Sequence, residues 1–248
     1  MTFGPLQWIF AVLGALMVGV SKSGITGLSI LSIALFNHVF ASSKQASGIV
    51  LPLLIFGDMV AVLSYRRHTQ WRYLWKLFPF TALGVVLGYF ALGWVSDRQA
   101  RLMIGIIIVA LAALSFWRRY RSNRSETGTG GHSWVFAAAV GVIAGFITLV
   151  ANAAGPLMAI YLVSMRLPKM EYVGTAAVFF MCLNLFKVPF MVNLGLITVH
   201  SFGVNLMLAP AVVIGAFVGR WLVVRINQAL FENMVLCLSA IAGVLLLL

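Results

Sequence analysis

Acidic residues are scarce in this chain: Asp and Glu account for 5 of the 248 residues, against 17 Lys and Arg. All four charged types together make up 9% of the sequence, whereas soluble domains carry about 25%. So few charges exclude a soluble globular domain. In a soluble protein the net charge of +12 would indicate a nucleic-acid partner.

Residues that support catalysis or bind metals are also few. The two cysteines, Cys182 and Cys237, lie singly in apolar segments, and the four histidines lie near connections without forming a cluster. We therefore predict neither a disulfide nor a metal site, and no cofactor. The sequence has no G-x-S-x-G or H-E-x-x-H motif, no paired acidic motif and no G-x-x-x-x-G-K-[ST] phosphate loop. Both an enzyme with catalytic residues and an ATP-driven motor are disfavoured.

Apolar residues are abundant instead, at 62% of the chain, and the mean hydropathy is +1.04. Uncharged stretches long enough to cross a bilayer, about 17–25 residues each, recur along the whole length. Eight apolar segments lie at about 6–36, 45–64, 73–94, 100–117, 134–165, 172–191, 202–224 and 232–248. This pattern predicts an all-α polytopic membrane protein. No basic region precedes the first segment, so a cleaved signal peptide is not expected.

The basic residues are concentrated in two connections between apolar segments. Together these hold 8 of the 17 basic residues, with Arg66, Arg67, Arg72 and Lys76 in one and Arg118, Arg119, Arg121 and Arg124 in the other. Such clusters are typical of the cytoplasmic loops of membrane proteins, where anionic lipid headgroups are their partners. We expect a multi-pass protein of the cytoplasmic (inner) membrane, without a nucleic-acid partner.

The two halves of the sequence follow one plan. The stretch RRYRSNRSETGTGGH at 118–132 reads as a basic linker between an N-terminal transmembrane repeat, 1–117, and a C-terminal one, 133–248. An offset of 126 residues aligns Gly19 with Gly145, Gly48 with Gly174, and Asp58 with Asn184. PFTALGVVLG at 79–88 and PAVVIGAFVG at 210–219 share the pattern P-x-x-x-x-G-x-x-x-G at an offset of 131. This ordered series predicts an internal repeat.

The distribution of charge favours inverted repeats. No Lys or Arg occurs between Val188 and Gly219, yet simple alternation of eight spans would make that connection cytoplasmic and the basic ones external. The conflict disappears if the overlong first and fifth segments each break and return, at SKSGITG (21–27) and ANAAGP (151–156). We therefore predict two inverted repeats with up to ten spans, each with a broken or re-entrant first segment. The linker is then cytoplasmic and Leu248 external.

Lys22 is the only charged residue among the first 43 and lies inside the first break. Broken helices at membrane depth line cavities, and their freed N–H groups and positive half-helix ends favour an anion. We predict that Lys22 neutralises a small anion, assisted by the N–H groups of residues 23–27. The small and hydroxyl-bearing residues around it complete this half of the predicted site: Ser21, Ser23, Gly24, Thr26 and Gly27. The alternative is small-residue helix packing, with Lys22 reaching to the membrane interface.

The second break is predicted to supply the other half of the site. Asn152 offers an amide that can donate and accept, and Ala153 and Gly155 lie beside it. The repeat relation between the two breaks favours this interpretation. The alternative is a kink at Pro156, in which Asn152 merely satisfies freed backbone groups.

Further polar residues lie inside apolar spans. Asp58 has no neighbouring base in the sequence and is predicted to couple transport as a proton carrier, while a counter-ion of Lys22 or a purely structural ion pair are alternatives. Lys187 follows Asn184 by three residues, so both lie on one helical face, and we predict that both contact the anion. Lys187 is also close enough to the end of its span to reach the interface instead.

The stretches GVSKSGITGLSILSIALF and GFITLVANAAGPLMAIYL resemble the two glycine-rich signatures of the sulfite exporter TauE/SafE family, also called TSUP. LPKMEYVGTAAVFFMCLNLFKVPF resembles the corresponding stretch of members that carry ANAAGP, so the resemblance covers nearly the full chain. Many members have a Gly-Gly motif followed by proline, where this chain has Thr26-Gly27-Leu28 and Ala154-Gly155-Pro156. The resemblance implies movement of small sulfur-containing or organic anions, such as sulfite, sulfoacetate and related sulfonates, across the bacterial cytoplasmic membrane.

The predicted function is that of a secondary transporter for small anions, and export follows from the resemblance alone. A passive anion channel is the nearest alternative, and it would need no coupling residue such as Asp58. A membrane-embedded enzyme is the remaining alternative. Small anions and membrane lipids are the expected partners, and the sequence favours no particular oligomeric state.

Overall fold

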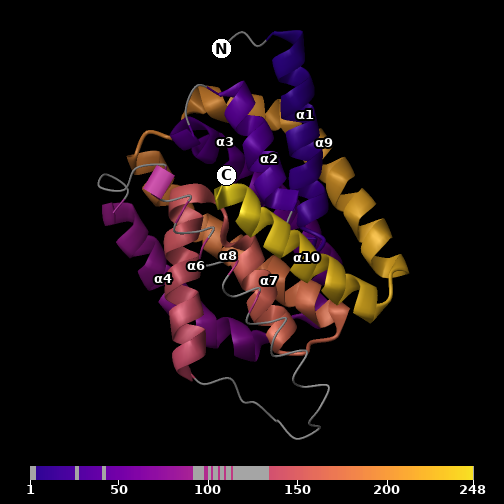
Figure 1. Cartoon of the computed structure of the whole chain (residues 1–248). Coiled ribbons are helices and arrows are strands. Elements are labelled where there is room, and N and C mark those ends of the chain that lie inside the picture. The colour runs from indigo at the N-terminus through magenta and orange to yellow at the C-terminus, as the bar shows by residue number, and fades with distance from the viewer. Residues whose placement is uncertain are drawn as a thin grey trace, which may run out of the picture.

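The computed structural model describes residues 4–25, 28–40, 43–91 and 134–247, and single positions at 98, 99, 102, 106, 109 and 113. Within these residues all regular structure is helical, as predicted. The helices are α1 (Pro5–Ser21), α2 (Leu28–Val39), α3 (Ser43–Tyr65), the 3₁₀ helix η1 (Arg66–His68), α4 (Trp71–Ala91), α6 (Trp134–Ala151), α7 (Ala154–Ser164), α8 (Lys169–Asn193), α9 (Val199–Arg225) and α10 (Gln228–Leu247) (Figure 1). The linker at 118–132 and Leu248 lie outside the described residues.

The long helices have the length and composition of membrane spans. Among the described residues, four stretches are long and apolar enough to cross a bilayer: Gly48–His68, Trp71–Ala91, Lys169–Asn193 and Val199–Arg225. Large apolar side chains on these helices point outward, such as Leu63 and Trp75, each 71% exposed. Outward-facing apolar side chains on long helices are what a lipid environment selects. The chain is a multi-pass membrane protein.

Both predicted interruptions are present in the structure. The first separates α1 from α2, and Gly24 there has a φ of 101°, a conformation that glycine adopts without strain. The second separates α6 from α7, and Asn152 there has a φ of 51°, in the left-handed region that Asn tolerates better than most residues. Pro156 lies in the first turn of α7, where its missing N–H removes no intrahelical hydrogen bond.

Glycines allow helices from opposite halves of the chain to touch along their backbones. A Cβ atom on Gly19 of α1 would lie 2.0 Å from the carbonyl oxygen of Val212 in α9. A Cβ atom on Gly145 of α6 would likewise lie 2.0 Å from the carbonyl oxygen of Thr81 in α4. Both positions therefore require glycine. The first helix of each half lies beside a long helix of the other half, α1 against α9 and α6 against α4 (Figure 1).

The partner helices make the reciprocal contact in the same way. A Cβ atom on Gly215 of α9 would lie 2.1 Å from the carbonyl oxygen of Leu16, and one on Gly84 of α4 would lie 2.1 Å from that of Val142. The residues of the two crossings correspond at the offsets of 126 and 131 seen in the sequence. In Figure 1, α1 runs down from the mark of the N-terminus whereas α6 runs upward.

The helices α3 and α8 pack against each other between the two crossings. On one side, buried residues of α1, α2, α3 and α9 form an apolar core that includes Val18, Phe36 and Val212. On the other, a larger core of α4, α6, α7 and α8 includes Leu77 and Phe179. The polar residues that the sequence singles out in α3 and α8 therefore lie in the interior of the molecule.

Candidate functional site

Lys22 and Asp58 form a buried ion pair. Lys22 caps the C-terminal end of α1, and its Nζ lies 2.8 Å from Oδ1 of Asp58 in α3. The Lys22 side chain is 8% exposed and that of Asp58 is fully buried. Its ammonium also lies 5.0 Å from the centre of the Phe180 ring, within the range of a cation–π contact. This geometry matches the counter-ion interpretation of Asp58 and contradicts the alternative in which Lys22 reaches to the membrane interface.

The side chain of Lys22 has room because residue 57 is glycine. A Cβ atom on Gly57 would lie 2.9 Å from Cγ of Lys22. The absence of a side chain at this position lets the aliphatic stem of the lysine pass along α3. Its ammonium can then reach the carboxylate of the next residue, Asp58.

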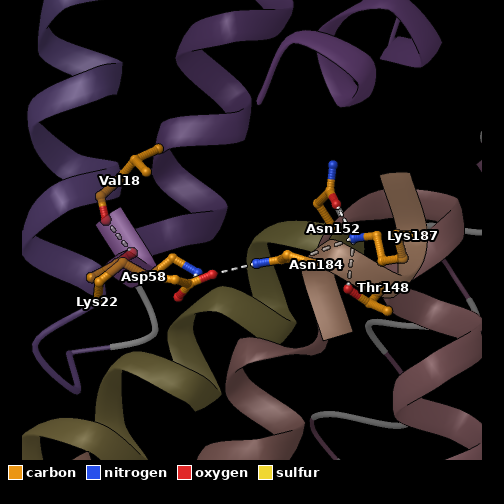
Figure 2. Close-up of polar contacts among 8 residues, drawn as sticks. Val18, Lys22, Asp58, Thr148, Asn152, Asn184 and Lys187 are labelled. Carbon is orange, nitrogen blue, oxygen red and sulfur yellow. Dashed lines mark hydrogen bonds and ion pairs between the residues drawn. The ribbon is translucent and has the colours of Figure 1, made fainter. Parts of the chain in front are cut away.

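Asn184 of α8 continues the chain of contacts from the carboxylate. Its amide Nδ2 donates a hydrogen bond of 2.7 Å to Oδ2 of Asp58 (Figure 2). Its Oδ1 lies 3.5 Å from Nζ of Lys187, one turn further along α8. Asn184 therefore bridges the carboxylate to a second lysine.

Lys187 is completely buried, so it does not reach the membrane interface as one alternative held. Its Nζ donates to Oγ1 of Thr148 in α6 at 3.1 Å and to Oδ1 of Asn152, in addition to the longer contact with Asn184 (Figure 2). All three acceptors are neutral oxygens. The left-handed backbone of Asn152 at the second break places its amide beside this lysine.

A cavity of about 30 Å³ lies where these residues meet. A cavity needs roughly 10–15 Å³ to hold one water molecule, so this space can hold a small ligand. The lining comes from both breaks and both central helices: Ser21, Lys22, Gly24, Ser29, Leu54, Asp58, Thr148, Asn152, Gly155, Ala176, Ala177, Phe180 and Asn184. Most of the predicted site residues are thus brought together around one space.

Other predicted site residues lie elsewhere. Ser23 does not line the cavity, because its hydroxyl donates to the carbonyl oxygen of Ala216 in α9 at 3.1 Å. Ala153 and Lys187 are buried but do not line the cavity. Thr26 and Gly27 lie outside the described residues.

Of the N–H groups of residues 23–27 that were predicted to assist an anion, those of Ser23 and Gly24 are not free. The N–H groups of Ser23 and Gly24 donate to the carbonyl oxygens of Val20 and Ser21, since the chain closes the end of α1 with turns. The hydroxyl of Ser21 likewise donates to the carbonyl oxygen of Val18 at 2.7 Å. Of the groups described up to Gly24 at this break, the ammonium of Lys22 is the one suited to hold an anion.

Thr148 and Phe180 are parts of the site that the sequence interpretation missed. Thr148 carries a detectable signal, because it follows Lys22 by the repeat offset of 126 residues and so occupies the corresponding position in the second half. Phe180 carries no such signal. It is one of 18 phenylalanines, and its place beside Lys22 depends on how α8 packs against α1 and α3.

The remaining ligand-type residues do not extend the site. Within the described part of the chain, no group of three or more His, Cys, Asp or Glu side chains is placed to hold a metal ion. Cys182 and Cys237 are both free thiols. The polar groups around the cavity are ammonium, amide, hydroxyl and one carboxylate, which suit the reversible binding of an anion.

Comparison with known proteins identifies one family. The model of the family described as Sulfite exporter TauE/SafE matches residues 11–246, which include both breaks and the whole cavity lining. No curated protein and no solved structure matches the chain.

Proposed function

The chain belongs to the TauE/SafE sulfite exporter family, whose members are membrane transporters, and we propose that it is a secondary transporter that exports small sulfur-containing anions such as sulfite and sulfonates across the cytoplasmic membrane. The observation that carries the proposal is the cavity between two interrupted helices, with two buried lysines and one carboxylate around it. Buried charges are costly in a membrane protein and mark ion or substrate pathways. The excess of positive charge favours an anion.

The proposal includes an architecture of two inverted repeats with up to ten spans and a cytoplasmic linker. The matched glycine contacts support it, because Gly19 against α9 and Gly145 against α4 have the same geometry. The opposite directions of α1 and α6 support inversion rather than parallel repetition. In transporters built this way, the substrate site lies at the interface of the repeats and near the middle of the membrane.

Asp58 is proposed to link proton binding to anion binding. While it is ionised, its carboxylate and an anion in the cavity both attract the ammonium of Lys22 and repel each other. Protonation of Asp58 releases Lys22 to the anion and removes that repulsion. Each ligand therefore strengthens the binding of the other by the same factor, which couples anion binding to proton binding.

A flux assay on the purified protein in liposomes tests the proposal. Labelled sulfite is placed outside liposomes loaded with unlabelled sulfite, thiosulfate, a sulfonate or a carboxylate. A secondary transporter for sulfur anions accelerates entry of the label when sulfite or a sulfonate is inside, because each outward crossing returns the site for an inward one. Equal entry with every internal anion would indicate a passive channel. No entry above protein-free liposomes would contradict an anion transporter.

A further inference from the structure

The two repeats contribute unequal charges to the cavity. At the repeat offset of 126 residues, Lys22 corresponds to Thr148 and Asp58 to Asn184, so the ion pair of the first half has two neutral counterparts in the second. Lys187 is an additional cation, and its counterpart in the first half is Ala61. Two positive charges and one negative charge thus surround the cavity, which leaves an excess of +1.

The contacts of Lys187 can satisfy all three donors of a protonated amine. An ammonium group has three N–H donors and no acceptor. Three acceptor oxygens surround Nζ of Lys187, on Thr148, Asn152 and Asn184, and the amide oxygens can only accept. Hydrogen bonds hold this charge in place, but no carboxylate in the described residues lies within ion-pair distance of it.

The charge of Lys187 acts on the cavity through the wall. The three residues that accept its hydrogen bonds all line the cavity, while Lys187 itself does not. An anion in the cavity is therefore separated from the ammonium by a single layer of neutral side chains. The nearest carboxylate, Asp58, already has its own cation in Lys22.

We propose that Lys187 sets the charge of the transported anion, so that the site with Asp58 ionised prefers singly charged anions over doubly charged ones. This inference rests on the proposed function, since it concerns the substrate of that same site. A monoanion brings the buried charge of the cluster to zero. A dianion leaves an excess negative charge in the interior, which is costly without a partner. Lys187 is a specificity-determining residue that does not touch the substrate.

Thermal unfolding of the purified protein in detergent tests this inference without a transport assay. Methanesulfonate, a monoanion, and sulfate, a dianion, are titrated separately, because both present a tetrahedral sulfur group of similar size. A ligand at free concentration L that binds the folded state stabilises it by RT ln(1 + L/Kd), so the rise of Tm with ligand concentration gives Kd. The unaltered protein is expected to bind methanesulfonate at least 10-fold more tightly than sulfate.

Substitutions of similar size that change the number of charges around the cavity test the excess of +1. Lys187→Met reduces the excess from +1 to 0 and is expected to weaken methanesulfonate binding about 10- to 100-fold. That range is typical of removing one unit charge several ångströms from an anion at an effective dielectric of about 20. The double variant Asp58→Asn/Lys187→Met removes the carboxylate as well and returns the excess to +1. It is expected to recover most of the affinity that Lys187→Met loses.

A matched control removes a lysine that lies away from the cavity. Nζ of Lys169 donates to the carbonyl oxygens of Val223, Val224 and Ile226 at the end of α9. Lys169→Met is expected to lower Tm without changing the concentration of methanesulfonate that raises it. A general effect of losing a lysine would appear in this control.

The outcomes separate this inference from the proposed function. Unchanged methanesulfonate affinity in Lys187→Met, or a double variant no better than Lys187→Met, overturns the role of Lys187 while the transporter proposal stands. If Lys187→Met does not fold, the same comparison is made with Lys187→Gln, which also removes the charge. Binding of neither anion by the unaltered protein, together with no flux of sulfite in liposomes, overturns both.

Discussion

Asp58 and Asn184 are joined by a hydrogen bond of 2.7 Å, although 126 residues separate them in the sequence. The same separation relates Gly19 to Gly145 at the two helix crossings. In a molecule with two related halves, a residue can touch its own counterpart only at the axis that relates them. The proposed repeat therefore has its axis between these two side chains. One is a carboxylate and the other an amide, so the halves differ in charge at their meeting point.

Substitution Asp58→Asn is expected to remove the pH dependence of anion binding while binding itself persists. In the unaltered protein, affinity should fall as pH rises, because ionised Asp58 competes with the anion for Lys22. An asparagine cannot ionise and leaves Lys22 available at every pH. Titration of sulfonate binding at several pH values, by the change in Tm, gives the comparison. The same pH dependence in both proteins would reduce Asp58 to a structural role.

Gly19 and Gly145, at the two helix crossings, are expected to contribute similarly to the stability of the protein. Gly19→Ala and Gly145→Ala each place a Cβ atom 2.0 Å from a carbonyl oxygen, which forces the crossing helices apart. Overpacking of this kind typically costs about 1–3 kcal/mol, and both variants should unfold at lower temperature by similar amounts.

Gly203→Ala provides the control for the two crossing glycines. Residue 203 also lies inside a helix, α9, but nothing lies within 4 Å of an added Cβ atom. Alanine is a better helix former than glycine, so this variant should be as stable as the original or slightly more so. A large fall in unfolding temperature for Gly19→Ala with none for Gly145→Ala would count against the equivalence of the two crossings.

The proposed topology predicts that the linker at 118–132 is cytoplasmic and Leu248 external. The basic linker belongs on the cytoplasmic side, and the two returning segments change the side on which the chain ends. Reporter proteins that are active only in the cytoplasm, fused within the linker and after Leu248, should therefore give opposite results. Activity at both places would favour eight plain spans over inverted repeats.

The sequence predicts the two helix breaks because their signals are local. It singles out the polar residues inside apolar segments for the same reason. A lone lysine beside glycines, and a proline after ANAAG, are visible without knowing the partner helices. The contacts of these residues are not visible in this way. Whether Lys22 pairs with Asp58 or reaches the interface depends on the packing of α1 against α3, and the hydroxyl of Ser23 is bonded because α9 crosses there. Whether Lys187 touches the anion or lies behind the cavity wall likewise depends on α6, because Thr148 of that helix accepts a hydrogen bond from its Nζ.

The measurement that tests the central claim most directly is sulfite flux in liposomes with Lys22→Gln, at equal amounts of folded protein. A charge-assisted hydrogen bond typically contributes about 1.5–3 kcal/mol, so the variant should bind sulfite roughly one to two orders of magnitude more weakly and transport it correspondingly less at low concentration. Lys22→Arg should recover only part of this loss, because a planar guanidinium replaces a compact ammonium poorly in the space beside Gly57. A folded Lys22→Gln protein that transports sulfite with unchanged affinity would contradict the account.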